Sequence, residues 1–142
     1  MQAATQQVKT NTAPRRPEVT RRAALPDLIK SHLRWLKEPT NGARADLSRM
    51  DLAGLDLSGI NLSGAVMVAV DCRGAKFRGA NLTNADLFAA DLTDADLSSA
   101  DLQGSGAVFW TLDGANLANA IWVNGVRCLP SSTDGVCNLP ED

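Results

Sequence analysis

The stretch ADLTDADLSSADLQG, residues 90–104, contains three consecutive copies of one five-residue unit. A small residue comes first, an acidic residue second, leucine third, a polar residue fourth, and a small or turn-forming residue fifth. This frame runs from Ala45 to Asn124 without an insertion or deletion. An uninterrupted repeat predicts a stack of near-identical structural units, each in contact mainly with its neighbours.

The apolar residues of the repeat occupy two positions of each unit. The third position is usually leucine and the first is usually alanine. Two apolar positions two residues apart, in a period of five, fit neither a long helix nor a plain alternating strand. Each unit is therefore expected to form a short extended segment followed by a corner, with the first and third side chains inside.

On these residues the chain resembles the pentapeptide-repeat proteins, a family of bacterial type, over residues 45–124. The resemblance implies an all-β solenoid: a right-handed, quadrilateral β-helix with four units in each coil. Residues 45–124 then form about four coils.

Four segments are expected from the distribution of charge and apolar residues. Residues 1–24 form a basic arm, which is poor in large apolar side chains and is predicted to be disordered. Residues 25–44 contain an amphipathic helix and a linker, residues 45–124 the repeat, and residues 125–142 a capping loop and tail. Residues 1–44 carry nine Lys and Arg against three Asp and Glu, whereas the repeat carries four against ten.

The helix is predicted from Pro26 to about Glu38, with an apolar face and a charged face. We expect its apolar face to cover the open first coil, since an uncovered strand edge exposes unpaired backbone groups. The alternative is a helix that binds a partner or a membrane surface. His32, the only histidine, lies on the apolar face and is expected to be packed and hydrogen-bonded rather than a ligand or a base.

The location follows from the absence of a suitable apolar segment. Arg21 and Arg22 precede a stretch with several charged residues, which does not fit the uncharged core of a signal peptide. No apolar run is long enough for a membrane span. A cytoplasmic protein is expected. Cys128 and Cys137 flank a turn and could form a disulfide, in which case an exported, oxidising compartment becomes the alternative.

No catalytic motif is found, so the chain is expected not to be an enzyme. The sequence contains no nucleophile elbow and no phosphate-binding glycine loop. No cofactor and no metal site are expected, because no zinc-type ligand spacing is present. Nucleic-acid binding is not expected either, since the basic arm is opposed by an acidic body.

One side of the predicted coil is unusually apolar. Outward positions of the units that begin at residues 45, 65, 85 and 105 include five large apolar residues: Val66, Val68, Phe88, Val108 and Phe109. We call this set the apolar side. Three explanations stay open: a terminal segment folds over it, it joins two copies or binds another protein, or it is too broken to matter. Association with another protein or a second copy is the preferred interpretation, because contiguous apolar patches usually mark contacts.

A second candidate surface is acidic. The acidic face consists of Asp51, Asp71, Asp91, Asp94 and Asp113, with Arg73 among them. In pentapeptide-repeat proteins such faces have been likened to DNA, and some members bind DNA gyrase. The resemblance therefore implies an alternative function, an acidic DNA mimic that binds a DNA-handling protein such as gyrase. Aspartate is also simply common at this position of the repeat in the family.

Overall fold

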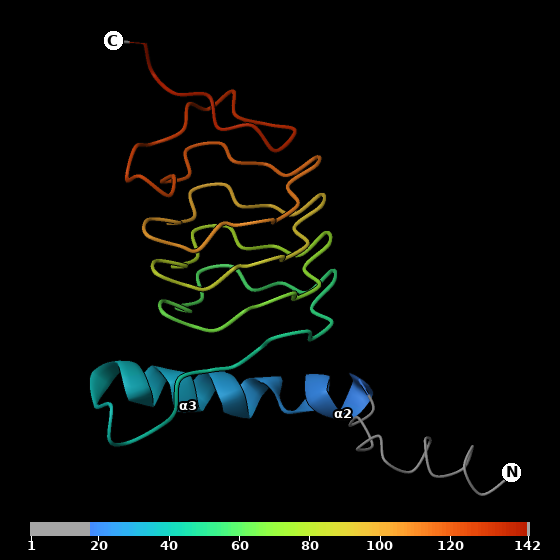
Figure 1. The fold of residues 1–142 in the computed structure, drawn as a ribbon, viewed down its shortest axis with the longest axis vertical. Coiled ribbons are helices and arrows are strands. Elements are labelled where there is room, and N and C mark those ends of the chain that lie inside the picture. Colours follow the sequence, from blue (N-terminus) through green and yellow to red (C-terminus); the bar gives the residue numbers. More distant parts are fainter. Residues whose placement is uncertain (1–17, 142) are drawn as a thin grey trace, which may run out of the picture.

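The computed structural model describes residues 18–141, which form two helices followed by a stack of coils (Figure 1). Helix α2 spans Glu18–Ala23 and helix α3 spans Leu25–Lys37. Both helices lie across one end of the stack, and the C-terminal segment closes the other end. Residues 1–17, most of the predicted arm, lie outside the described residues.

The stack is held together by parallel β-bridges between residues twenty positions apart. One such column joins Asp46 to Val66, Val66 to Asp86 and Asp86 to Gly106. The backbone hydrogen bonds alternate in direction: the amide of Leu47 donates to the carbonyl of Val66 at 2.7 Å, and the amide of Val66 donates to the carbonyl of Ala45 at 2.9 Å. Each coil therefore takes twenty residues, which is four units. The fold is a β-helix solenoid in which short bridges replace long strands.

The core is formed by the third and first positions, as the repeat predicts. Third-position side chains are almost fully buried from the first coil to Leu102, and the first-position alanines lie beside them. Phe77 and Cys72 take third positions and are buried as well. Burial of one leucine side chain contributes about 1.5–3 kcal/mol before entropy is subtracted, so the column of leucines is a main source of stability.

The fifth position turns the corner in a left-handed backbone conformation. Glycine takes many of these positions and adopts positive φ without strain. The other residues with positive φ in the repeat are Arg49, Ala69, Asn84, Ala89, Asp94, Ser99, Phe109 and Asn119. Asparagine and aspartate tolerate this conformation, but a bulky aromatic residue does not favour it. Phe109, at φ 57°, is the exception in this set.

The second position is Asp or Asn for a local structural reason. In unit after unit its side-chain oxygen accepts a hydrogen bond from the amide of the fourth residue, as from Ser98 to Asp96 at 3.0 Å and from Ala118 to Asn116 at 3.0 Å. This arrangement is an Asx turn, which satisfies an amide that the bonds between coils do not use. Both residue types can accept the bond, so the turn does not require the negative charge.

The helices supply hydrogen-bond donors to the open edge of the first coil. Arg21 donates to the carbonyl of Ser48, and Arg22 donates to that of Ala53 at 3.4 Å. Nε2 of His32 bonds the carbonyl of Ser63 at 2.9 Å. These carbonyls all belong to fourth positions, whose equivalents in later coils accept amides from the coil before. The helix side chains thus take the place of a preceding coil.

His32 is held by its two ring nitrogens. Its Nδ1 accepts a hydrogen bond from the amide of Ala45 at 3.0 Å, so the proton resides on Nε2, which donates to Ser63. The ring is fully buried and stacks on Trp35 at a centroid distance of 5.4 Å. Burial, reinforced by the nearby charge of Arg44, lowers the pKa of His32 although the Ser63 bond opposes the shift.

Two features of this end differ from the predicted boundaries. Helix α2 lies at residues 18–23, in the segment for which the sequence predicts a disordered arm. It forms where Arg21 and Arg22 reach the first coil, and such contacts cannot be read from composition. Helix α3 begins and ends one residue before the predicted positions. Among residues 18–141, no helix is long and apolar enough to cross a membrane.

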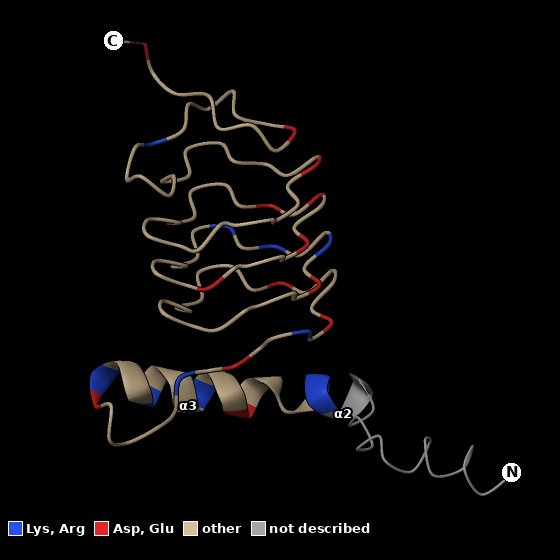
Figure 2. Cartoon of the chain, in the orientation of Figure 1, with Lys and Arg blue, Asp and Glu red and all other residues tan. Residues whose placement is uncertain are grey.

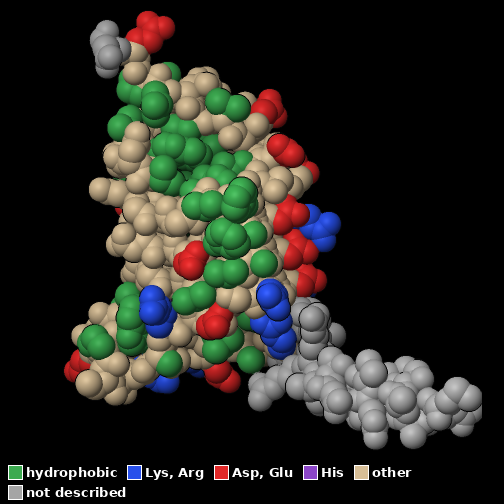
Figure 3. All heavy atoms as spheres, in the orientation of Figure 1, with side chains coloured by type: hydrophobic (Ala, Val, Ile, Leu, Met, Phe, Trp, Pro, Cys, Tyr) green, Lys and Arg blue, Asp and Glu red, His purple; other side chains and the backbone are tan. Residues whose placement is uncertain are grey.

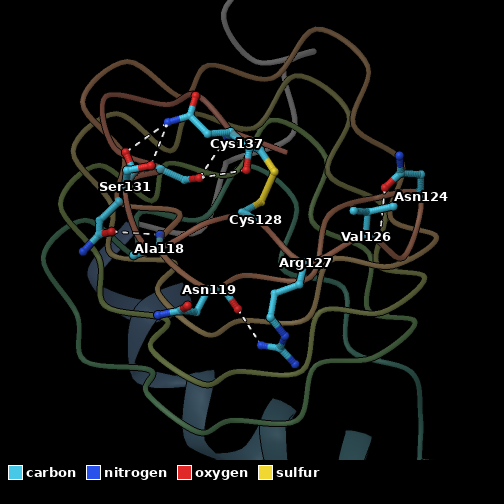
Figure 4. Close-up of a disulfide and its surroundings, with 11 residues drawn as sticks. Ala118, Asn119, Asn124, Val126, Arg127, Cys128, Ser131 and Cys137 are labelled. Carbon is cyan, nitrogen blue, oxygen red and sulfur yellow. Dashed lines mark hydrogen bonds between the residues drawn. A yellow bond between two sulfur atoms is a disulfide. The ribbon is translucent and has the colours of Figure 1, made fainter. Parts of the chain in front are cut away.

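At the other end, the C-terminal segment pairs with the last coil. The amide of Cys128 donates to the carbonyl of Ala120 at 2.7 Å, and the amide of Leu117 donates to the carbonyl of Ser132 at 2.9 Å. Cys128 and Cys137 are joined by a disulfide with a Cα–Cα distance of 5.1 Å (Figure 4). The bond closes a short loop, and the Arg127 side chain donates to the carbonyl of Asn119 beside it.

Candidate interaction surface

The apolar side lies on one side of the stack, where units 65–69, 85–89 and 105–109 follow one another along the axis. Val66 takes a second position, and Val68, Phe88 and Val108 take fourth positions in successive coils. Figure 3 shows a face of the molecule on which hydrophobic side chains form a band along the stack. The band continues toward the C-terminal end.

Phe88 and Phe109 form the most prominent part of the apolar side. Their rings meet edge to face at a centroid distance of 5.7 Å. The exposed fractions are 42% for Phe88, 55% for Val108 and 78% for Phe109. Val66 and Val68 are partly exposed. The five residues are thus brought together, and within residues 18–141 the two phenylalanines and Val108 stay open to solvent.

Neither terminal segment covers this surface in the part of the chain that the structure describes. Helix α2 reaches the first-coil end of the apolar side, where Arg21 donates hydrogen bonds to the carbonyls of Ser48 and Arg49. Those contacts are to the backbone of the first coil and leave Phe109 exposed.

The acidic face is divided by the structure. Asp51, Asp71 and Asp91 lie in one column of parallel bridges, which we call the acidic column. Asp94 and Asp113 take fifth and fourth positions and are linked through the amide of Asp94 and the carbonyl of Asp113 at 2.8 Å. Figure 2 shows acidic residues recurring along an edge of the stack and basic residues on the helices.

The acidic column also has a structural role that composition did not suggest. Each of its carboxylates accepts a hydrogen bond from a backbone amide of its own turn, as Asp51 does from the amide of Ala53 at 3.0 Å. Arg73 donates two hydrogen bonds to Asp71, at 2.9 and 2.8 Å, and lies 4.0 Å from Asp91. The Arg73 bond lowers the pKa of Asp71. Part of the charge is therefore neutralised within the chain.

The described residues offer little for catalysis. An open depression is lined by Thr83, Asn84, Gln103, Gly104, Val123 and Asn124, none of which is a charged acid, base or activated nucleophile. Residues 18–141 contain no group of three or more His, Cys, Asp or Glu that could hold a metal ion. Cys72 is buried, and this burial raises the pKa of its thiol, so it is not a reactive thiolate.

Sequence reasoning missed the cap contacts of Arg21 and Arg22, which it assigned to a solvated arm. It also missed Gly106, which lies beside Val108 at a second position without an Asx-turn side chain. The signal was present in the sequence, since glycine at a second position breaks the repeat.

The model of the pentapeptide-repeat family matches residues 43–67 and 67–104, with eight copies of the repeat. No curated protein matches the chain.

Solved structures of the same family are similar to it. A pentapeptide repeat protein (Rfr23) from the cyanobacterium Cyanothece 51142 is 37% identical, with 56% of this chain and 61% of that chain covered and a TM-score of 0.35. AT2G44920, from the thylakoid lumen of Arabidopsis thaliana, is 37% identical over 53% of this chain and 48% of that chain, with a TM-score of 0.26. The chain thus spans about half to three fifths of the lengths of these two relatives.

The protein alr5209 from Nostoc PCC 7120 is 31% identical, with 67% of this chain and 76% of that chain covered and a TM-score of 0.38. The repeat frame, the eight matched copies and this coverage lead to one conclusion: the chain belongs to the pentapeptide-repeat family.

Proposed function

We propose that this chain is a non-enzymatic protein interaction module: a right-handed, four-sided rod of about four coils that binds another protein chain through its apolar side. The helices α2 and α3 cap one end, and the loop closed by Cys128 and Cys137 caps the other. The sides of the rod, rather than a cleft, are then the surfaces that a partner contacts.

The proposal depends on one observation, the exposure and the backbone conformation of Phe109. Its side chain is 78% exposed, and its backbone has a φ of 57°, which costs a bulky residue about 1–2 kcal/mol. Most other fifth positions carry glycine, alanine or a small polar residue. Backbone preference disfavours an aromatic residue here, and the ring contact with Phe88 leaves most of the Phe109 side chain exposed, whereas a contact with another chain would bury it.

Site-specific crosslinking tests the proposal. A photoreactive amino acid replaces Val108 on the apolar side, and in a matched control it replaces Gln103, a fourth-position residue on a neighbouring side. The purified chain and a cell extract are irradiated in turn. We expect adducts from position 108 only, and we expect Phe88→Asp with Phe109→Asp to abolish them. Equal adducts from both positions, or none from either, would contradict the proposal.

The acidic face supports a second candidate function, a DNA mimic that binds a DNA-handling protein. The regular bridging of Asp51, Asp71 and Asp91 favours it, because it spaces the carboxylates evenly along the rod. The affinity of such binding should fall strongly between 50 and 500 mM salt, because the Debye length shrinks from above about 10 Å to below about 5 Å over that range. Asp71→Lys should abolish it, and a gyrase-type target that binds this variant normally would exclude it.

The disulfide bears on location. A bond between Cys128 and Cys137 favours an oxidising compartment, the alternative that the sequence leaves beside the cytoplasm. Thiol labelling of the protein taken directly from its cells decides between the two.

A further inference from the structure

We infer that the apolar side binds a second copy of this chain, around a two-fold axis parallel to the stack, with Phe109 of each copy packed against Gly106 of the other. The inference rests on the proposed function and names its partner. Its support is the shape and the charge of the two edges of this side.

The two edges are two columns of residues. One edge is the column of second positions: Asp46, Val66, Asp86 and Gly106. The other edge is the column of fifth positions, which all have positive φ: Arg49, Ala69, Ala89 and Phe109.

The edges are complementary in shape in the last coil. Phe109 projects from the fifth-position edge, while Gly106 leaves the second-position edge of the same unit without a side chain. The backbone does not need glycine there, because Gly106 is not among the glycines with positive φ. A Cβ atom added to Gly106 would meet Oδ1 of Asp86 at 3.5 Å, an ordinary contact. This absence of a side chain at Gly106, which we call the hollow, is therefore not a requirement of the coil.

The edges are complementary in charge in the first coil. Asp46 lies on the second-position edge and Arg49 on the fifth-position edge of one unit, and both are exposed. A side that carries a knob and a hollow at one level, and a positive and a negative residue at another, can pair with itself.

Symmetry selects the axis. A two-fold axis parallel to the stack exchanges the two edges and keeps every residue at its level, so Phe109 meets Gly106 and Arg49 meets Asp46 of the partner copy. A two-fold axis across the stack would instead place each edge of one copy against the same edge of the other copy. It would then place the two acidic columns side by side, where like charges repel.

Sedimentation equilibrium over a concentration series tests the inference. The wild-type chain should form a dimer. Phe109→Gly should weaken the dimer on the order of a hundredfold, because each interface loses two aromatic anchors. The left-handed backbone suits glycine, so this variant should fold at least as well as the wild type.

Gly106→Val fills the hollow and should also weaken the dimer, at least as strongly as Phe109→Gly does. The coil accepts valine in this column, since Val66 is already there. Thr111→Val is the matched control, a second position on the next side, and should leave the dimer intact.

Asp46→Asn with Arg49→Asn tests the charges without disturbing the turns. Asn61 makes the same Asx turn as Asp46, and Asn84 has the same left-handed backbone as Arg49. The double variant should weaken the dimer about tenfold at low salt and less at high salt.

The outcomes separate the two proposals. A dimer that keeps the wild-type affinity in Gly106→Val or in Phe109→Gly overturns the inferred geometry. A wild-type monomer at every concentration overturns the second-copy inference, while crosslinking from position 108 to another protein then leaves the proposed function in place. A monomer without any such crosslink overturns both.

Discussion

At the scale of single residues, the repeated aspartate is explained by hydrogen bonding rather than by charge. The side chain of Asp101 accepts a hydrogen bond from the amide of Gln103 at 3.0 Å. In the coil before, the side chain of Asn81 accepts one from the amide of Thr83 at the same distance. The acceptor oxygen is common to both. An acidic body can therefore arise from a structural preference for Asx turns, with no selection for an acidic partner.

Asp101 provides the test of this explanation. Asp101→Asn should change the free energy of unfolding by less than about 0.5 kcal/mol, whereas Asp101→Ala should cost about 1 kcal/mol because an amide loses its partner. Urea unfolding of both variants measures the difference. Equal costs for Asn and Ala would show that the carboxylate acts through its charge.

Prediction from sequence succeeded or failed at this scale for identifiable reasons. The burial of Leu97 and Ala95 follows from a strict period, and so does the exposure of Phe88. The conformation of Phe109 does not, because φ at the fifth position depends on the corner that the whole coil imposes. The Arg73 bonds to Asp71 also needed coordinates, since a long side chain has several partners within reach.

At the scale of elements, a neutral histidine is one of the side chains that join the helical cap to the first coil. The pKa of His32 is lower in the folded protein than its ordinary value of about 6.5. As the pH falls, the unfolded chain therefore takes up this proton before the folded chain does. The contribution of His32 to stability is full above about pH 6.5 and is lost as the pH falls toward the lower folded value.

Unfolding by urea between pH 7.5 and pH 5 measures this effect. The wild type should lose stability over that range, and His32→Gln should be less stable at pH 7.5 but nearly flat below it. The carboxylates of Asp46, Asp56 and Asp71, whose pKa values are lowered by hydrogen bonds, titrate below this range. Parallel pH profiles for the two proteins would rule out His32 as the sensitive group.

The other cap depends on the disulfide. Cys128 and Cys137 are nine residues apart. The chain-entropy model gives about 2.5 kcal/mol for a loop of that length. Reduction should therefore lower the melting temperature, and Cys128→Ser with Cys137→Ser should show the same lower value with or without reductant. Cys72 is buried and outside the disulfide, and it is present in both proteins, so it controls for any effect of the reductant on a free cysteine. An unchanged melting temperature after complete reduction would contradict a stabilising disulfide.

At the scale of the whole molecule, the repeat alone was enough to indicate the β-helix, because every unit reports the same two inward positions. The ends could not be derived in the same way. Helix α2 and the hydrogen bond between Leu117 and Ser132 each occur once, so the repeat does not predict them. The apolar side was predicted from the alignment of units twenty residues apart, and the structure places its five residues together. The chain that binds there does not follow from the period, because binding depends on contacts between molecules.

The most direct test of the apolar side is the absolute mass of the wild type beside the double variant Phe88→Asp, Phe109→Asp, by light scattering over a concentration series. Both substitutions have precedents in this chain, since Asp113 takes a fourth position and Asp94 a fifth position with positive φ. The variant should therefore stay folded. We predict that the wild type approaches twice the mass of one chain and that the variant stays at the mass of one. Equal masses for the two proteins at every concentration would contradict self-association through the apolar side.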